Sequence, residues 1–600
     1  MSPPTGRESR VLRFKVQAGC PRVLRVFPNK ASLLRLVSAL LAENTEDSET
    51  GKLYLNTPPR IHRRTDDPSP SEESLWPRVR GRLKVKAYTM SANQDEVLIR
   101  LHPDDDVAVA RRRLLAGEQA GHLRLTGAIP AAHKVALHPL AQGSPIRKYG
   151  QFIGRASVDI PAGAHVHVHN VDTGELATGD HFVAPTAPWD LLPEAERRTF
   201  QGFTRPGGRA GTRNYVAVIS SVNCSASVSQ FVARRFTPEA LRRDFPGVDG
   251  VVAFTHKAGC ATADEGTEIL QRVLVGIARH PNIGAYVIIG LGCETNQAAA
   301  MVRRHGLDQS ETGSEPPLVL NIQQQGGISR TVEDAVKAVS DLLPAVNAQR
   351  RSTQPLSRLI VALNCGGSDG HSGITANPAL GWASDLIIRH GGTTVLAETP
   401  EIYGAEHLLT RRAVSREVSD ALLERIRWWE DHARKHGASM SNNPSAGNKE
   451  GGLTTIFEKS LGAVAKGGQA PLMSVLHYAQ TITGPGLCFM DTPGYDPVSM
   501  TGLVAGGCTV GVFTTGRGSV YGCKPAPCIK VSTHTPLYRW MEGDIDLNAG
   551  TILDGEETIP QVGQRIFEAI LAAANGERTK SEHAGIGDEE FAPWPLGPVF

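Results

Sequence analysis

The chain has few aromatic residues, few cysteines and no long hydrophobic run, and each shortage limits what the protein can be. Aromatic residues make up 6% of the 600 residues while 40% are hydrophobic, which suits a soluble α/β protein. No hydrophobic run approaches the roughly 18 residues needed to cross a bilayer, so we expect no membrane partner. The nine cysteines are too sparse for a disulfide scaffold and indicate reduced thiols in the cytoplasm.

A concentrated basic surface is also missing from the body of the chain. Residues 1–89 carry 17 Lys and Arg against 9 Asp and Glu, whereas the remainder carries 46 against 52. This balance argues against a nucleic-acid partner, which requires a concentrated basic face. The motif TTGRG (514–518) does not match the phosphate-binding pattern GxxxxGK[ST], so nucleotide use is not supported either.

Residues 1–89 form an arginine-rich leader without periodicity, and Met90 opens a strand-like segment. Three explanations stay open: an over-extended translation start, a disordered tail, or an organellar transit peptide. The acidic residues within 43–49 and 66–73 count against the transit peptide.

The rest of the chain divides into three regions, in line with its length. Short strand-like runs broken by Asp, Pro and Gly predict a β-rich domain over residues 95–175. A linker near 185–198 leads to two α/β regions with largely parallel sheets, 200–346 and 357–598. In the second, Asn377 and Pro378 predict a helix start, and Gly391 and Gly392 predict its end.

Four cysteines each follow an apolar, strand-like run: Cys224 after YVAVISS, Cys260 after VVAFTH, Cys293 after AYVIIG and Cys365 after LIVALN. Side chains just past the ends of parallel strands converge on one edge of the sheet, where open α/β sheets bind ligands. The pattern predicts a thiol-rich site at that edge. The alternative is that each cysteine merely packs under a tight turn.

The loops after these strands also carry polar side chains. The loop NCGGSDGHSGITANP (364–378) supplies Ser368, Asp369 and Asn377 beside Cys365, and its glycines allow close approach to a ligand. GLGCETNQ (290–297) supplies Glu294 and Asn296. THKAGC (255–260) supplies His256 and Lys257, and LAETPE places Glu398 and Glu401 after a further strand.

Two more segments supply candidate substrate contacts. The long loop MSNNPSAGNKEGG (440–452) is a candidate lid or clamp through Asn448 and Lys449. The turn after TVGVF offers Thr515 and Arg517, and an arginine held there suits bidentate capture of a carboxylate.

The motifs GGSDGHSGITANP, GLGCETNQ, NPSAGNKEGG, TTGRG and DLNAGTILDGEET resemble the altronate/galactarate dehydratase family, from about residue 97 to the C-terminus. The resemblance implies an N-terminal SAF domain, which is a β-clip module, and a two-part catalytic region. It also implies iron-dependent removal of water from a sugar acid to give a 2-keto-3-deoxy product. The chain departs from the family at Ala258, where an aromatic residue is usual.

In such a reaction a base removes the proton next to the carboxylate, and a metal stabilises the charge that develops. We expect His256 or Lys257 as the base and Asp369 or Glu398 as the assisting acid. Eight residues are expected to bind substrate: Glu294, Asn296, Ser368, Asn377, Asn448, Lys449, Thr515 and Arg517.

Thiols select iron or zinc, so we expect Cys224, Cys260, Cys293 and Cys365 to hold ferrous iron or an Fe–S centre. His102, His133 and the histidines of HVHVHN (165–170) are rival ligands. On a strand, alternating histidines lie on one face, which could bind metal or be an exposed, hydrogen-bonded surface.

Three functions therefore stay open. The first is a hydro-lyase acting on altronate, or next on galactarate. The second is a sulfolactate sulfo-lyase that releases sulfite, and the third is a non-catalytic sugar-acid binding protein. We expect a cytoplasmic chain whose partner is a small-molecule sugar-acid substrate and which can form a homo-oligomer.

Overall fold

The computed structural model describes residues 97–174, 182–183, 189–309, 317–597 and 599. The predicted leader and part of the predicted linker lie outside these residues. Within the described ranges, no helix is both long and apolar enough to cross a membrane.

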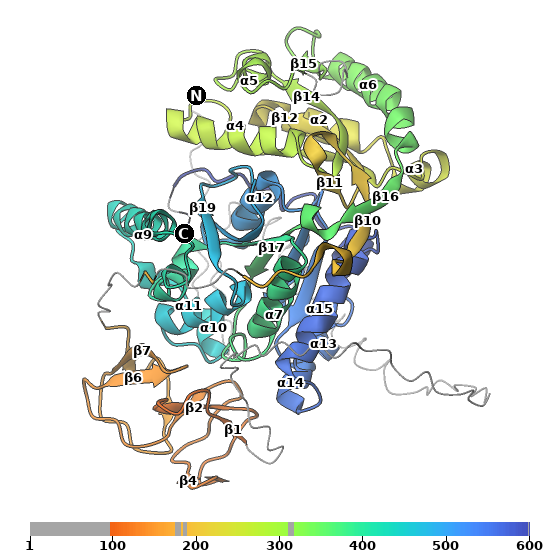
Figure 1. Cartoon of the computed structure of the whole chain (residues 1–600). Coiled ribbons are helices and arrows are strands. Elements are labelled where there is room, and N and C mark those ends of the chain that lie inside the picture. The colour runs from red at the N-terminus through yellow and green to blue at the C-terminus, as the bar shows by residue number, and fades with distance from the viewer. Residues whose placement is uncertain (1–96, 175–181, 184–188, 310–316, 598, 600) are drawn as a thin grey trace, which may run out of the picture. The chain divides into compact units, whose positions relative to one another are not determined.

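Residues 97–174 form the expected β-rich module of short antiparallel strands (Figure 1). One sheet has the order β1-β2-β5-β8, a second β6-β7-β9, and β3 pairs with β4. The strand bounds are β1 Leu98–Ile99, β2 Val107–Ala110, β3 Gln119–Ala120, β4 Leu123–Arg124, β5 Lys134–Ala136, β6 Pro145–Lys148, β7 Gln151–Ala156, β8 His165–Val166 and β9 Val171–Asp172.

The histidine run HVHVHN is a strand only at β8, because residues 167–170 form a turn. The Asn170 side chain closes this turn, since its Oδ1 accepts from the His167 amide at 2.9 Å and its Nδ2 donates to the His165 carbonyl at 3.0 Å. The expectation of three histidines along one strand is therefore wrong.

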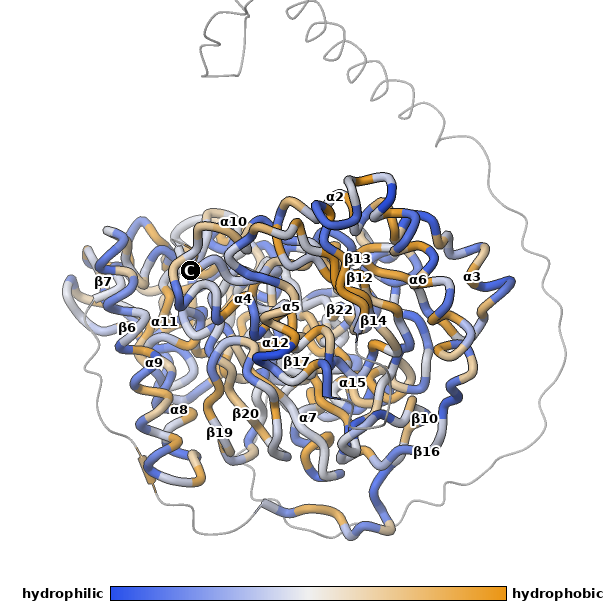
Figure 2. Tube along the Cα trace, turned by 90° about the horizontal axis from the view of Figure 1, so that it is seen from above, coloured by the Kyte–Doolittle hydropathy of each residue, from blue (hydrophilic) through white to orange (hydrophobic). Residues whose placement is uncertain are grey.

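A four-stranded parallel sheet with the order β13-β12-β14-β15 follows along the chain. Along β12, Val216 and Val218 face one hydrophobic core, and Ala217 and Ile219 face another. Figure 2 shows β12 as a hydrophobic stretch between its helices. The bounds are β12 Tyr215–Ser220, β13 Gly250–Phe254, β14 Ile283–Gly290 and β15 Val319–Asn321, with helices α2 Ala226–Ala233, α3 Pro238–Asp244, α4 Asp264–Ala278, α5 Ala298–Arg304 and α6 Ile328–Ala348.

A small antiparallel sheet, β11-β10-β16, brings the two ends of this region together. Its strands are β10 Thr199–Thr204, β11 Ala210–Gly211 and β16 Arg351–Pro355. Strand β16 occupies the segment in which the sequence predicts a break between two α/β regions.

The C-terminal region is built on a seven-stranded parallel sheet with the order β19-β20-β18-β17-β21-β22-β23. Strand β17 lies at its centre. Val361 and Leu363 of β17 pack in one core with α7 and α15, while Ala362 packs in another with α12, so helices cover both faces. The strands are β17 Ile360–Cys365, β18 Thr393–Leu396, β19 Leu472–Leu476, β20 Gly486–Met490, β21 Val510–Thr515, β22 Cys528–Ser532 and β23 Leu547–Asn548.

The helices of this region include the one predicted after Asn377. Helix α7 begins at Ala376, and Gly391 and Gly392 follow it into β18 as expected. The bounds are α7 Ala376–Arg389, α8 His407–Thr410, α9 Arg416–Lys435, α10 Ala446–Glu450, α11 Ile456–Val464, α12 Asp496–Gly506, α13 Thr535–Trp540, α14 Thr551–Asp554, α15 Ile559–Ala574 and α16 Lys580–Ala584.

The predicted long loop 440–452 is only partly irregular, because α10 occupies its second half. Ser445 starts this helix with a capping box in which its side chain and that of Asn448 bond each other's backbone amides. Serine is among the residues preferred at the N-cap. The sequence signal for a helix start was therefore present inside the loop.

Two buried lysines join the β-rich module to α11. Lys134 of β5 and Lys148 of β6 each donate to the Glu458 carboxylate at 2.8 Å, and all three side chains are at most 1% exposed. One carboxylate faces two ammonium groups. Burial outweighs the attraction of Glu458 and lowers the pKa of Lys134 to about 8.

Candidate functional site

The candidate site is built where β17 and β18 end side by side. The Sγ atom of Cys365, the last residue of β17, lies 3.7 Å from Glu398 Oε2 and 3.6 Å from Glu401 Oε2. The sulfur and one oxygen of each carboxylate lie within 4.8 Å of one another, and all three residues are buried. The sequence places Cys365, Glu398 and Glu401 just after strands, but it predicts only Cys365 and Glu398 as site residues.

Glu398 is held in an uncommon backbone conformation. Its φ of 68° is left-handed, which is costly for a residue other than glycine, and such strained residues tend to cluster at functional sites. The Glu398 amide donates to Thr492 Oγ1 at 2.9 Å, which fixes the turn. The carboxylate oxygen Oε1 is buried and has no hydrogen-bond partner.

Two lysines that the sequence prediction missed offset the negative charges of Glu398 and Glu401. Lys466 Nζ donates to Cys365 Sγ at 2.9 Å and to Glu398 Oε2 at 2.7 Å. Lys459 Nζ donates to Glu401 Oε1 at 2.6 Å and to Asn443 Oδ1 at 2.8 Å. A sequence signal existed, because a lysine inside an apolar helical run needs a buried partner.

Burial shifts the proton equilibria of this cluster. It raises the pKa of Glu398 to about 7, against the attraction of the Lys466 ammonium. Burial and the charge of Glu398 also raise the pKa of the Cys365 thiol. The carboxyl of Asp496 has a pKa well above its usual range because it is desolvated and lies near Glu398 and Glu401. Such clusters are typical of functional sites.

A cleft of about 470 Å³ opens onto the cluster. Asp496 reaches it from the start of α12, and a Cβ on Gly366 would lie 2.3 Å from Asp496 Oδ2, so only glycine fits after Cys365. Carboxylates, an ammonium group and amides therefore face one small space. The polar lining residues include Glu401, Asn443, Asn448, Lys459 and Asp496, and Gly366 and Gly367 also line the cleft.

Asn448 is the predicted substrate contact that lies in the cleft. Its Nδ2 donates to the Ser368 carbonyl at 2.9 Å, and its Oδ1 lies 3.5 Å from Lys459 Nζ. These bonds tie α10 to the loop after β17. Lys449 is partly exposed on the same helix.

Other predicted residues of the C-terminal region brace the loops around the cleft. Both carboxylate oxygens of Asp369 accept hydrogen bonds, Oδ1 from Ser372 Oγ and Oδ2 from Thr533 Oγ1. Asn377 does not cap α7, because its Oδ1 accepts from Thr514 Oγ1 and its Nδ2 donates to the Gly462 carbonyl.

The turn after β21 is braced in the same way. Thr515 Oγ1 accepts from the Gly518 amide at 3.0 Å. The Arg517 amide donates to the Gly367 carbonyl at 2.7 Å, and its half-exposed guanidinium lies 3.4 Å from Glu450.

The predicted residues of the four-stranded sheet lie apart from Cys365, at the ends of β12, β13 and β14. Cys224, Cys260 and Cys293 are exposed. Among the residues that the structure describes, two groups of three or more potential ligands lie within 4.8 Å, and these cysteines belong to neither. The expected gathering of four thiols is therefore not seen, because Cys365 ends a strand of a different sheet.

The remaining predicted side chains of that sheet hold its turns. His256 Nε2 donates to the Ser220 carbonyl at 2.9 Å and its Nδ1 accepts from the Ala258 amide at 3.2 Å. Burial lowers the pKa of His256 to about 4. Glu294 Oε1 accepts from Ser221 Oγ at 2.7 Å, and Asn296 Nδ2 donates to the Ser221 carbonyl at 2.9 Å, whereas Lys257 is exposed.

The rival histidine ligands separate in the structure. His102 accepts from the Asp104 amide and joins no ligand group of the described chain. His133, His165 and His167 form the second group of three.

Three family models match the chain in succession. They are the altronate/galactarate dehydratase SAF domain over residues 96–174, the D-galactarate dehydratase/altronate hydrolase second domain over 202–347, and the D-galactarate/altronate dehydratase C-terminal domain over 356–599. Together they cover most of the chain.

Curated relatives agree with these matches. The chain is 35% identical to the altronate dehydratase of Bacillus subtilis over 81% of its own length and 96% of the relative. It is 38% identical to the L-threo-forming galactarate dehydratase of Escherichia coli, over 83% and 97%. The beta subunit of the (2R)-sulfolactate sulfo-lyase of Chromohalobacter salexigens is 32% identical over 66% of the chain and 97% of that subunit.

Proposed function

The chain belongs to the altronate/galactarate dehydratase family, and on this premise we propose that it removes water from a sugar acid. Altronate is the first candidate substrate and galactarate the second. The observation that carries the proposal is the cleft, which is lined by Glu401, Asp496, Lys459 and Asn448. It is joined to Cys365 through Glu401, whose Oε2 lies 3.6 Å from the Cys365 sulfur. A polyhydroxy carboxylate needs such a mixture of charged and amide groups.

We propose ferrous iron as the metal of this site, held by Cys365 Sγ, the partner-free Oε1 of Glu398 and Oε2 of Glu401. The donor set fits, since a thiolate with two carboxylates suits iron better than magnesium or calcium. An orphaned, buried oxygen such as Glu398 Oε1 needs a partner. Iron bound there would polarise the substrate carboxylate and offset the negative charge around Asp496.

Binding and orientation fall to the polar residues of the cleft. The Lys459 ammonium lies between Glu401 and Asn443 and can also meet a substrate oxygen. Asn443 and Asn448 supply amide groups for the hydroxyls. Because Asn448 is fixed to the Ser368 carbonyl, the distance between α10 and the loop after β17 is set before the substrate enters.

Asp496 is the carboxyl of the cleft that is not among the three proposed iron ligands, so we assign the proton transfers to it. Its carboxylate takes the proton from the carbon next to the substrate carboxylate and returns it to the departing β-hydroxyl. The C–H and C–O bonds break, water leaves, and the resulting enol rearranges to a 2-keto-3-deoxy acid. His256 suits the role of base less well because both its ring nitrogens hold backbone groups.

The test is anaerobic incubation of the chain and Fe(II) with altronate, galactarate and sulfolactate in turn. A 2-keto-3-deoxy acid supports the proposal. Sulfite released from sulfolactate would favour the second function, which the likeness to the sulfo-lyase subunit supports. Binding of a sugar acid without any product, with iron content confirmed, would favour a binding protein.

Iron content of single variants tests the ligand assignment. Cys365→Ser should lose iron, while the exposed Cys293→Ser should keep it. Loss of iron in Cys293→Ser with retention in Cys365→Ser would move the metal to the four-stranded sheet, as first predicted. The cytoplasmic location and the homo-oligomer stay predictions.

A further inference from the structure

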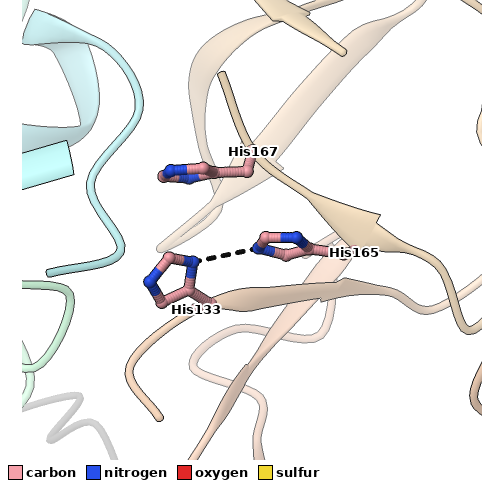
Figure 3. A group of neighbouring side chains, drawn as sticks. All are labelled: His133, His165 and His167. Carbon is pink, nitrogen blue, oxygen red and sulfur yellow. Dashed lines mark hydrogen bonds between the residues drawn. The ribbon is translucent and has the colours of Figure 1, made fainter. Parts of the chain in front are cut away.

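Three histidines of the β-rich module form a ligand group that the proposed dehydration does not use (Figure 3). His133 immediately precedes β5, His165 begins β8, and His167 opens the turn that follows. Antiparallel pairing of β5 with β8 places Val135 opposite His165, which brings His133 to the same end of the ladder. One nitrogen of each ring lies within 4.8 Å of the others.

Hydrogen bonding fixes which nitrogen of His133 is free to act as a ligand. Its Nε2 lies 3.1 Å from the Glu450 carbonyl oxygen, which can only accept. The proton must therefore sit on Nε2, and the lone pair of Nδ1 points to His165 Nε2 at 2.9 Å. Metal-binding histidines are commonly oriented by such a bond from the second ring nitrogen to a carbonyl.

His167 leaves a polar atom unsatisfied in the same cluster. Its Nδ1 is buried and has no hydrogen-bond partner. A buried polar atom without a partner destabilises the fold, because it has lost its bonds to water and gained none in return. A network of hydrogen bonds among neutral imidazoles thus accounts for His133 and His165 but not for His167.

The rings are also held in place before any ligand binds. The turn after β8 is closed by Asn170, which bonds the backbone of His165 and His167. The centroids of the His133 ring and the rings of His165 and His167 are 5.0 and 4.6 Å apart. The His133 Nδ1 and His165 Nε2 atoms are 2.9 Å apart and need little change, since nitrogens that share a tetrahedral zinc ion lie about 3.3 Å apart.

We propose that His133, His165 and His167 bind a divalent transition-metal ion of the zinc type and leave its fourth position to water. Three neutral nitrogens without a carboxylate favour zinc, cobalt, nickel or copper over magnesium and calcium. The ion would give the buried Nδ1 of His167 a partner. It would also bind the His133 and His165 nitrogens in place of the hydrogen bond that now joins them.

The site also has a structural consequence for the cleft. His133 bonds the carbonyl of Glu450, the last residue of α10, and α10 carries Asn448 into the cleft. A bound ion would fix His133 and, through it, one wall of the substrate site. The three histidines would position the wall of the cleft and would not contact the substrate, because none of them lines the cleft.

The test uses Co(II) as a visible-absorbing substitute for zinc in the full chain. The Cys365→Ser variant serves as the parent so that the other ligand group does not compete. Titration of the metal-stripped parent should give one equivalent of Co(II) with the intense absorption of tetrahedral coordination. His167→Ala and His165→Gln should each weaken binding by at least about tenfold.

His122→Ala is the matched control, because His122 is an exposed histidine of the same module outside the cluster. It should bind Co(II) like the parent. Thermal unfolding in EDTA should be the same for His167→Ala and the parent, which separates lost ligation from lost folding. The proposal is overturned if the folded parent binds no Co(II), or if both cluster variants bind as tightly as His122→Ala. Either result is independent of dehydratase activity.

Discussion

Glu458→Gln removes the carboxylate charge that balances two buried ammonium groups. In the unaltered chain Glu458 Oε1 accepts from Lys148, and Oε2 accepts from Lys134 and from the amide and hydroxyl of Thr454. The three charged side chains are at most 1% exposed, so water cannot take over these bonds. Glutamine keeps the shape of the side chain and loses its charge.

The expected cost follows from the fate of the lysines. Without Glu458, a buried lysine must stay charged and unpaired or lose its proton. Neutralising one lysine at pH 7 from a usual pKa near 10.5 costs roughly 5 kcal/mol. Removing one partner of a buried ion pair costs about 3–5 kcal/mol in practice. We therefore expect the free energy of unfolding to fall by about 3–5 kcal/mol.

Urea unfolding with separate probes of the β-rich module and of the whole chain measures this loss. Glu568→Gln is the matched control, because Glu568 pairs with Arg198 and both side chains are about half exposed, 46% and 48%. Exposed pairs contribute at most about 1 kcal/mol. If the two glutamine variants lose the same small amount, the buried triad is not what holds the module on α11.

Three further variants test other parts of the structure. Asp496→Asn should slow dehydration by about 10²–10⁴-fold with iron content unchanged. An undiminished rate would show that Asp496 does not transfer the proton. Burial lowers the pKa of His280 from 6.5 to about 4. The neutral ring therefore stabilises the fold fully above pH 6.5, and this stabilisation, roughly 3 kcal/mol, is lost as the pH falls to 4. The urea midpoint of His280→Gln should accordingly depend less on pH than that of the unaltered chain. Gly276→Ala would place a Cβ 2.2 Å from the Ala505 carbonyl oxygen, where α4 crosses α12. We expect this clash to destabilise the chain by about 1–3 kcal/mol. An unchanged melting temperature would contradict this packing.

Sequence reasoning succeeded where local patterns determine structure. The apolar runs before the cysteines are strands β12, β13, β14 and β17, and Cys365 and Glu398 meet because β17 and β18 are parallel neighbours. The rule that strand ends converge holds within one sheet. It does not tell which strands share a sheet, and so it wrongly added Cys224, Cys260 and Cys293 to Cys365.

The other site residues that the sequence did not predict are brought in by contacts between distant segments of the chain. Lys466 is 101 residues from Cys365 and Lys459 is 58 from Glu401, so no spacing in the sequence pairs them. The histidine group is a similar case. HVHVHN supplied two members, but the third, His133, comes from the neighbouring strand through the β5–β8 pairing, while His169 is exposed.

Helix α11 links the module to the cleft through consecutive residues. Glu458 points to the lysines of the β-rich module, and Lys459 points to Glu401 in the cleft. Successive residues of a helix lie about 100° apart, so one helix can serve both sides only if its rotation is fixed. Movement of α11 in Glu458→Gln should therefore displace Lys459 and raise the KM for the sugar acid, although Glu458 itself does not line the cleft. Steady-state kinetics under conditions in which the variant stays folded measures this, and an unchanged KM would show that docking of the module and the position of Lys459 are independent.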